Sequence, residues 1–417
     1  MGEKKMKVAI YNGRIPATTF IERLIEGVAK TGVVVQLYGE VCEPVSYYNP
    51  NVRTYGWKGK FGRWSLYFKY LPLLLLFRPK EVIALWKNYR PQNLRIKLFK
   101  FSQFLPVLWH KPDVFHVQWA KSLKDWYWVR HFGMRLVVSL RGSQLNYAPL
   151  VEENTAELYR IYFPMVNGFH AVSHAIKCKA QLYGASVESA RVVYSGLDAR
   201  DFAFYPDKPK RNKLHILSVG RAHWIKGYTY ALDACQMLKG KIDFQYAIIG
   251  GFCQEHAFHV NDAELEGQVT LTGALPFEEV QRHMQESDVL LLPSVEEGIA
   301  NVVLEAMALG TPVISTDCGG MAEVIEDGVN GILVPTRDTQ ALAEALMRFA
   351  VLSPEERKRL ALAARQTIEQ RFQQKQMVDK MIALYREVMA KGGLEGSMKY
   401  KKETVSLVRH DNLGKPV

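Results

Sequence analysis

Residues 290–316 read LLLPSVEEGIANVVLEAMALGTPVIST. The leucines before Pro293 predict a buried strand that ends at the proline. An apolar-faced segment, 301–309, then predicts a helix that stops at Gly310, with Pro312 just beyond. A further apolar run, 312–315, predicts the next strand. Strand, helix and strand in this order indicate two parallel strands joined by a helix.

The same alternation extends in both directions from this segment. In the second half, we predict helices at 229–238 and 278–286 and strands at 214–219, 244–249, 269–272 and 289–292. In the first half, we predict a helix at 18–30 and strands at 8–11, 33–37, 114–117, 136–139, 169–172 and 191–194. The pattern predicts an α/β fold of two Rossmann-like parallel-sheet domains.

The boundary between the domains is predicted from the polar, proline-punctuated stretch DFAFYPDKPKRNK, residues 201–213. We place an N-terminal domain at 1–203 and a C-terminal domain at 204–375, and we expect the tail 392–417, with few apolar residues, to be disordered. The chain has 417 residues, of which 48% are hydrophobic and 23% charged, so it is large enough for two cores. The N-terminus lacks the features of a secretory signal, which predicts a cytoplasmic protein.

The formal net charge of +12 predicts attraction to an anionic partner. Residues 53–111 are rich in Lys and Arg, contain a single acid, Glu81, and interleave aromatic residues such as Trp64 and Phe68. This combination favours peripheral contact with an anionic membrane, on the inner face of the plasma membrane, over nucleic acid binding, and we predict no nucleic acid partner. The apolar run 71–77 is far shorter than the roughly 20 residues that span a bilayer. The alternative is that these aromatics are ordinary core.

Two groups of residues in the second half could carry chemistry. Glu297 and Gly298 lie in the loop before a helix that carries Glu305, where loop amides and the helix N-terminus favour an anion such as a diphosphate. Arg221 and Lys226 follow another strand end in SVGRAHWIKGYTYAL (218–232), where two cations can neutralise a leaving diphosphate. Solvated loop charges, with Glu305 as a helix-dipole partner, are the structural alternative.

Several other activities are disfavoured by the sequence. Eight consecutive helical positions would separate Glu297 and Glu305 by about 12 Å, more than a glycosidase carboxylate pair needs, although a loop start could shorten this distance. No Asp-x-Asp pair is present to hold a metal-diphosphate complex, so we predict a metal-independent reaction without a cofactor. The sequence has no GxxxxGK[ST] phosphate loop and no GxGxxG after the first strand. These absences disfavour a P-loop ATPase and an NAD dehydrogenase.

The second half resembles the retaining glycosyltransferases of family 4, which have the GT-B fold of two Rossmann-like domains facing across a cleft. The similar segments are VGRAHWIKG (219–227), TGALPFEEV (272–280) and SVEEGIANVVLEAMALGTPVISTDCGGMAEVIEDGVNGILV (294–334). RIPATTFIERLIEGVAKTG (14–32), in the first half, is similar to exopolysaccharide transferases of the colanic-acid type. The resemblance implies that a final helix, 376–391, crosses back to the N-terminal domain.

The resemblance also implies roles for individual residues. Glu297 would meet the donor-sugar hydroxyls and Glu305 the nucleotide ribose, while Arg221 and Lys226 would hold the diphosphate. Further donor contacts are implied for Gly13, Gly220, Gly273, Leu275, Gly298, Ile299, Ala300, Asn301 and Val302. Where relatives carry His-x-His and His-Gly, this chain has His116 with Gln118 and Arg141 with Gly142. His116 therefore either faces a sugar as a catalytic residue or is a core histidine.

The expected function is retaining transfer of a sugar from a UDP- or GDP-linked donor to a hydroxyl of a polysaccharide, lipid-linked or other glycan acceptor, in bacterial surface polysaccharide synthesis. Two rivals stay open. A sugar-nucleotide epimerase of GT-B fold would need no acceptor, and a non-catalytic sugar-nucleotide-binding protein would turn nothing over. The two glutamates with their spacing favour transfer over the first, and the presence of all four donor-site side chains argues against the second.

Overall fold

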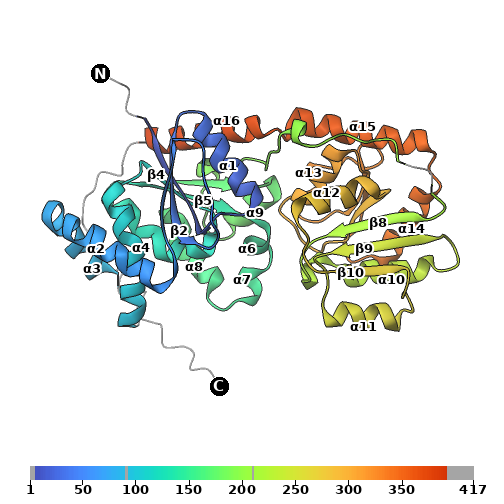
Figure 1. The fold of residues 1–417 in the computed structure, drawn as a ribbon, viewed down its shortest axis with the longest axis horizontal. Coiled ribbons are helices and arrows are strands. Elements are labelled where there is room, and N and C mark those ends of the chain that lie inside the picture. Colours follow the sequence, from blue (N-terminus) through green and yellow to red (C-terminus); the bar gives the residue numbers. More distant parts are fainter. Residues whose placement is uncertain (1–4, 90–92, 209–210, 392–417) are drawn as a thin grey trace.

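The computed structural model describes residues 5–89, 93–208 and 211–391, and the predicted tail 392–417 lies outside them. Two parallel sheets, each covered by helices on both faces, lie side by side along the long axis of the molecule (Figure 1). The predicted α/β architecture of two parallel-sheet domains is therefore confirmed.

The N-terminal sheet has seven strands in the order β3-β2-β1-β4-β5-β6-β7. Its strands are β1 (Lys7–Ile15), β2 (Val34–Val41), β3 (Val52–Trp57), β4 (Val114–Val117), β5 (Arg135–Leu140), β6 (Gly168–Ala171) and β7 (Ala190–Val192). Around it lie α1 (Thr19–Lys30), α2 (Gly59–Phe77), α3 (Pro79–Asn88), α4 (Leu94–His110), α5 (Leu123–Trp126), α6 (Gly142–Asn146), α7 (Ala148–Val151), α8 (Thr155–Tyr162) and α9 (His174–Gln181). The order reverses between β1 and β4, which is where open α/β sheets bind ligands.

The C-terminal sheet has six strands in the order β10-β9-β8-β11-β12-β13. They are β8 (Leu214–Val219), β9 (Phe244–Ile249), β10 (Val269–Thr272), β11 (Val289–Leu292), β12 (Val313–Thr316) and β13 (Ile332–Val334). The covering helices are α10 (Tyr228–Leu238), α11 (Gln254–Asp262), α12 (Phe277–Glu286), α13 (Asn301–Leu309), α14 (Thr339–Ala350) and α15 (Pro354–Arg371). The central strands β8 and β11 are adjacent, so the loops that follow them leave the sheet side by side.

The last helix, α16 (Gln374–Ala390), lies against the N-terminal domain although it follows α15 of the C-terminal domain (Figure 1). Met381 and Tyr385 are buried in one core cluster with Ile21 and Leu24 of α1. The segment 355–391, which is helix-forming throughout, is thus two helices with a break at Phe372 and Gln373. The chain crosses between the domains twice, and α16 anchors the second crossing.

The predicted linker is held against the C-terminal domain. Lys208 lies in it, is half-buried, and its Nζ donates to the Gln285 carbonyl (2.7 Å) and to Thr311 Oγ1 (3.0 Å). Burial lowers the pKa of Lys208 to about 8. The Tyr205 amide donates to the Leu309 carbonyl (2.9 Å). These contacts place the linker beside the C-terminal ends of α12 and α13.

Two features of the N-terminal domain differ from the sequence-based expectation. Helices α2, α3 and α4, together with the edge strand β3, fill the segment between β2 and β4, in which no element was predicted. Gly13 was expected in the loop after the first strand, but β1 continues through it to Ile15. The pairing of β1 with β2 shifts register between Ile10 and Gly13, and the φ of +87° at Gly13 suits this bulge, since glycine adopts positive φ without strain.

Candidate active site

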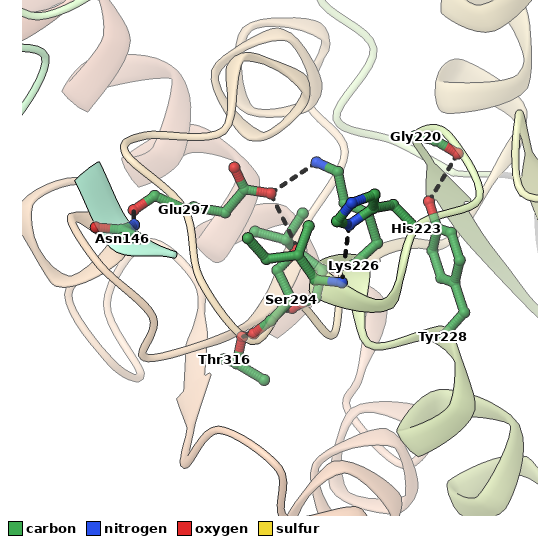
Figure 2. A network of polar contacts seen from close by, with 10 residues as sticks. Asn146, Gly220, His223, Lys226, Tyr228, Ser294, Glu297 and Thr316 are labelled. Carbon is green, nitrogen blue, oxygen red and sulfur yellow. Dashed lines mark hydrogen bonds and ion pairs between the residues drawn. The ribbon is translucent and has the colours of Figure 1, made fainter. Parts of the chain in front are cut away.

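The loops that follow β8 and β11 meet at an ion pair between Lys226 and Glu297 (Figure 2). Lys226 Nζ lies 2.7 Å from Glu297 Oε1, and both side chains are mostly buried, 19% and 15% exposed. Ser294 Oγ donates to the same carboxylate oxygen at 3.0 Å. Both of these contacts are made to Oε1 and neither to the other carboxylate oxygen, Oε2. A partly buried pair of this kind is stronger than a surface salt bridge, because water screens it less.

The backbone holds these two loops in register. The Val295 amide donates to the Ile225 carbonyl at 2.8 Å. Gly227 has a φ of +65°, and a Cβ there would lie 2.0 Å from the Pro293 carbonyl oxygen, so only glycine fits. On the other side of the β8 loop, Tyr228 Oη donates to the Gly220 carbonyl at 3.0 Å. Gly220 and Gly227 thus allow the two loops to approach closely, and this approach brings Lys226 to Glu297.

The N-terminal domain contacts the same loop. Asn146 Nδ2 donates to the Glu297 carbonyl oxygen at 3.0 Å. Gly142 lies so close to Gly298 that an added Cβ would stand 2.5 Å from the Gly298 nitrogen. Lys179 of α9 pairs with Glu296 at 3.0 Å. The Glu297 loop is therefore part of the interface between the two domains.

Glu305 is held across the interface by a residue that the sequence analysis did not single out. Arg23 of α1 donates from Nη2 to Glu305 Oε1 at 3.1 Å, and the Glu305 side chain is 12% exposed. Burial raises the pKa of Glu305, and the positive charge of Arg23 opposes this rise. Arg23 lies in the stretch 14–32, which is similar to exopolysaccharide transferases. This similarity was the only feature of the sequence that could have pointed to Arg23.

The remaining predicted donor residues occupy the same face of the C-terminal domain or its margins. Gly298, Ile299 and Ala300 are buried, and they lead directly into α13, whose first residues are Asn301 and Val302. Arg221 is exposed in the β8 loop. Gly273 and Leu275 follow β10, which is separated from β11 by β9 and β8, and Gly273 is exposed. Within the described parts of the chain, no group of three His, Cys, Asp or Glu side chains could hold a metal ion.

His116 is corrected from a candidate catalytic residue to a core histidine. Its side chain is 0% exposed in β4, with Nδ1 2.8 Å from Tyr385 Oη and Nε2 2.8 Å from Ser139 Oγ. Ser139 Oγ is also 2.8 Å from His170 Nδ1, so a buried polar chain runs through the N-terminal sheet. Both ring nitrogens of His116 are thus hydrogen-bonded inside the core. Gly13 lies in its strand bulge beside Gly39.

The buried histidines predict an acid-sensitive N-terminal domain. Burial lowers the pKa of His170 to about 3 and holds the pKa of His116 well below its ordinary value. In the unfolded chain both titrate near 6.5, so below that pH the unfolded state binds more protons and the free energy of unfolding falls. Each histidine contributes a slope of about 1.4 kcal/mol per pH unit.

Urea unfolding followed by tryptophan fluorescence measures this effect, since every tryptophan except Trp224 lies in the N-terminal domain. Between about pH 6 and 4.5, the His170→Gln variant should lose stability less steeply than wild type, by about 1.4 kcal/mol per pH unit. Parallel slopes for the two proteins would show that His170 is protonated in the folded state or does not titrate in the unfolded one.

A known family matches the sequence of the C-terminal domain, which carries these side chains. Residues 213–350, which contain Arg221, Lys226, Glu297 and Glu305, match the family model described as "Glycosyl transferases group 1". The family match therefore covers the loops that form the Lys226–Glu297 pair and the helix that carries Glu305.

Two curated relatives share sequence with the chain over a longer stretch. The amylovoran biosynthesis glycosyltransferase AmsK of Erwinia amylovora is 33% identical over 251 residues, which is 57% of this chain and 60% of the relative. The putative colanic acid biosynthesis glycosyltransferase WcaL of Escherichia coli K12 is 35% identical over 214 residues, 49% of this chain and 52% of the relative. The chain thus matches about half to three-fifths of the length of these relatives.

Solved structures resemble the whole molecule. Sucrose-phosphate synthase from Thermosynechococcus elongatus superposes with a TM-score of 0.74 over 93% of this chain and 100% of its own, at 19% identity. Anabaena HepE in complex with UDP-glucose gives a TM-score of 0.65 over 92% of this chain and 100% of its own, at 17% identity. At this identity the likeness establishes the fold alone, and it confirms the predicted GT-B fold.

Proposed function

We propose that the protein is a retaining, metal-independent glycosyltransferase that moves a sugar from a nucleoside-diphosphate sugar to a hydroxyl of a polysaccharide or lipid-linked glycan in bacterial exopolysaccharide synthesis. The observation that carries the proposal is the convergence of Lys226, Glu297 and Glu305 at the domain interface, on the loops after β8 and β11 and on α13. The names of the two curated relatives support the exopolysaccharide context.

In the proposed site, different side chains bind the diphosphate, the sugar and the ribose of the donor. Lys226 and Arg221 are the cations for the diphosphate, together with the backbone at the start of α13. Glu297 accepts from sugar hydroxyls, because Lys226 and Ser294 contact only its Oε1. Glu305 accepts from the ribose hydroxyls. A carboxylate would repel phosphate, so each glutamate is useful only beside neutral hydroxyls.

The mechanism follows from the charges. As the bond between the anomeric carbon and the diphosphate breaks, negative charge grows on the leaving phosphate, and Lys226 and Arg221 stabilise it. An acceptor hydroxyl attacks on the face that the diphosphate leaves, so the configuration is retained. The leaving phosphate oxygen takes the hydroxyl proton. No protein base is needed, which agrees with the burial of His116 away from solvent.

The test of the donor site is a thermal-shift panel of UDP-, GDP- and ADP-sugars. We expect one nucleotide class to raise the Tm of the wild type, and we expect the rise to vanish in Glu305→Ala and in Arg221→Ala/Lys226→Ala. The control is Lys179→Ala, which removes the neighbouring ion pair to Glu296 and should keep the response. A wild type that no sugar nucleotide stabilises at millimolar concentration would refute the proposal.

The same panel distinguishes sugar transfer from the two rival functions when the reaction products are measured. Nucleoside diphosphate should be released only when a glycan acceptor from bacterial membranes is added. Release of an epimerised nucleotide sugar without acceptor would assign an epimerase. Binding without turnover under either condition would assign a sugar-nucleotide-binding protein.

A further inference from the structure

A row of large apolar side chains lies exposed along α2. Phe61, Trp64, Phe68, Leu75 and Leu76 are all exposed, Phe61 at 91% and Phe68 at 79%. Their spacing of three, four or seven residues places them on one face of the helix, and Leu76 lies next to Leu75. We call these five residues the outer stripe. Monomeric proteins rarely leave such a continuous apolar face to water, so it indicates an interaction surface.

The opposite face of α2 already has its partner inside the protein. Leu66, Tyr70 and Leu74 are buried in the core of the N-terminal domain. Beside the outer stripe, α2 lies against α4, where Tyr67 Oη donates to the Leu98 carbonyl (2.5 Å) and the Arg63 guanidinium lies 4.2 Å from the Phe99 ring centroid. The orientation of α2 is therefore fixed, and the outer stripe faces away from the core.

The structure divides the aromatic residues of 53–111 into buried, partly buried and exposed side chains, and Tyr67, Trp86 and Trp109 are partly buried. Trp57, Tyr70, Phe101 and Phe104 are buried, so for these the interpretation as core is correct. Trp64, Phe68 and Phe99 are exposed, and so are Phe61 and Phe77, which the sequence analysis did not single out. On α4, Leu94 and Ile96 are exposed beside Phe99 at the N-terminal end of the helix.

The charge around the outer stripe has one sign. Lys60 and Lys69 are exposed and flank the stripe on α2, while Lys58 and Arg95 are exposed at the ends of the two helices. Neither 59–77 nor 94–110 contains an Asp or Glu. The single acid between them, Glu81, is neutralised by Lys111 at 2.7 Å. Apolar and aromatic side chains flanked by cations match the acyl boundary and the phosphates of an anionic bilayer.

We propose that the outer stripe and its flanking cations dock the protein on an anionic lipid bilayer, with α2 lying in the plane of the headgroups. No helix of the described ranges is long and apolar enough to cross a membrane, so the contact is peripheral. Helices α2 and α3 lie at the end of the N-terminal domain far from the C-terminal domain (Figure 1). Docking therefore leaves the domain interface clear, and it does not rest on the proposed function.

A lipid surface fits these residues better than a second copy of the chain. A second copy paired through the stripe would bring together two cationic surfaces, and neither α2 nor α4 offers an acid to neutralise Lys60 and Lys69, so like charges would disfavour association. A polar nucleic acid would satisfy the cations but would leave Phe61 and Phe68 in water. An anionic bilayer satisfies both groups at once.

The experiment is vesicle flotation of the full-length protein without donor. Vesicles of phosphatidylcholine alone are compared with vesicles containing about one third phosphatidylglycerol, an anionic lipid. We expect binding to the anionic vesicles only, weakened at high salt because the phosphates are then screened. Phe61→Ser/Phe68→Ser should lower the affinity by more than tenfold, and Lys60→Gln/Lys69→Gln by about fivefold for each cation removed.

Matched controls change exposed residues elsewhere. Leu182→Ser/Phe258→Ser removes two exposed apolar side chains, and Lys241→Gln/Arg282→Gln removes two exposed cations of the C-terminal domain. Both should float like wild type. Equal loss in the controls, or no flotation of wild type with anionic vesicles, would overturn the proposal. So would a dimer in solution that Phe61→Ser/Phe68→Ser converts to monomer, since it would assign the stripe to a second copy.

Discussion

Replacing Lys226 by methionine should lower kcat for sugar transfer by about two to three orders of magnitude, the usual effect of removing one group that stabilises a leaving charge. Lys226 Nζ lies 2.7 Å from Glu297, and both side chains are mostly buried, whereas Arg221, the other cation of this loop, is exposed. The rate is measured as nucleoside diphosphate release from the donor that the thermal-shift panel identifies, with membrane-extracted glycan as acceptor. Lys226→Arg should recover part of the rate, because it keeps the charge but not the geometry.

The matched control for this variant is Lys179→Met. It removes an ion pair of similar length, 3.0 Å, to the adjacent residue Glu296, but across the domain interface and without contact to Glu297. We expect its kcat to stay within about threefold of wild type, as for a partly exposed ion pair. If Lys226→Met and Lys179→Met lose the same fraction of activity, the effect comes from disturbed domain contacts and Lys226 has no part in the chemistry.

Replacing Arg23 by methionine should weaken nucleotide binding, and below the raised pKa of Glu305 the loss should grow by up to about tenfold per pH unit. Burial already raises the pKa of Glu305, and Arg23 is the charge that counteracts it. Without Arg23 the pKa rises further, so a larger fraction of Glu305 is protonated at neutral pH and its carboxylate accepts fewer hydrogen bonds from ribose. Affinity for the donor nucleotide, measured by calorimetry at several pH values, should recover at high pH.

The Arg23 experiment has two further arms. Arg23→Lys keeps a cation beside Glu305 and should show a pH dependence close to wild type. Glu305→Gln has no group to titrate there, so its weakened affinity should not change with pH in the same range. Tighter nucleotide binding in Arg23→Met than in wild type would contradict the prediction, since Arg23 would then compete with the ribose for Glu305.

Much of the C-terminal domain was predictable from local sequence. The strands at 214–219, 244–249, 269–272 and 289–292 were expected at the positions where the structure has them. Each is a short apolar run that ends at glycine, proline or polar residues, and the information needed to place it lies within a few residues. That the loops after β8 and β11 leave the same edge of the sheet also follows, because the C-terminal ends of parallel strands lie at one edge. Their adjacency depends on the strand order, which the tertiary structure supplies.

The N-terminal domain was less predictable. Helix α2 is apolar on two opposite faces, with exposed Phe61 and Phe68 on one and buried Leu66 and Tyr70 on the other. Periodicity could not locate a helix whose two faces are both apolar. Gly13 was misplaced for a related reason, because a strand bulge depends on the pairing with β2, which the sequence of β1 does not contain.

By itself the sequence determined the α/β alternation, the two-domain organisation and the charged side chains on the loops after β8 and β11 that we propose as the donor site, because these follow from short-range patterns of apolar, turn and charged residues. Only the tertiary structure decided which of those side chains have partners. It buried His116 between Tyr385 and Ser139, and it brought Arg23 to Glu305 from 282 residues away. Contacts between residues so far apart depend on how two domains pack, and no local pattern records that packing.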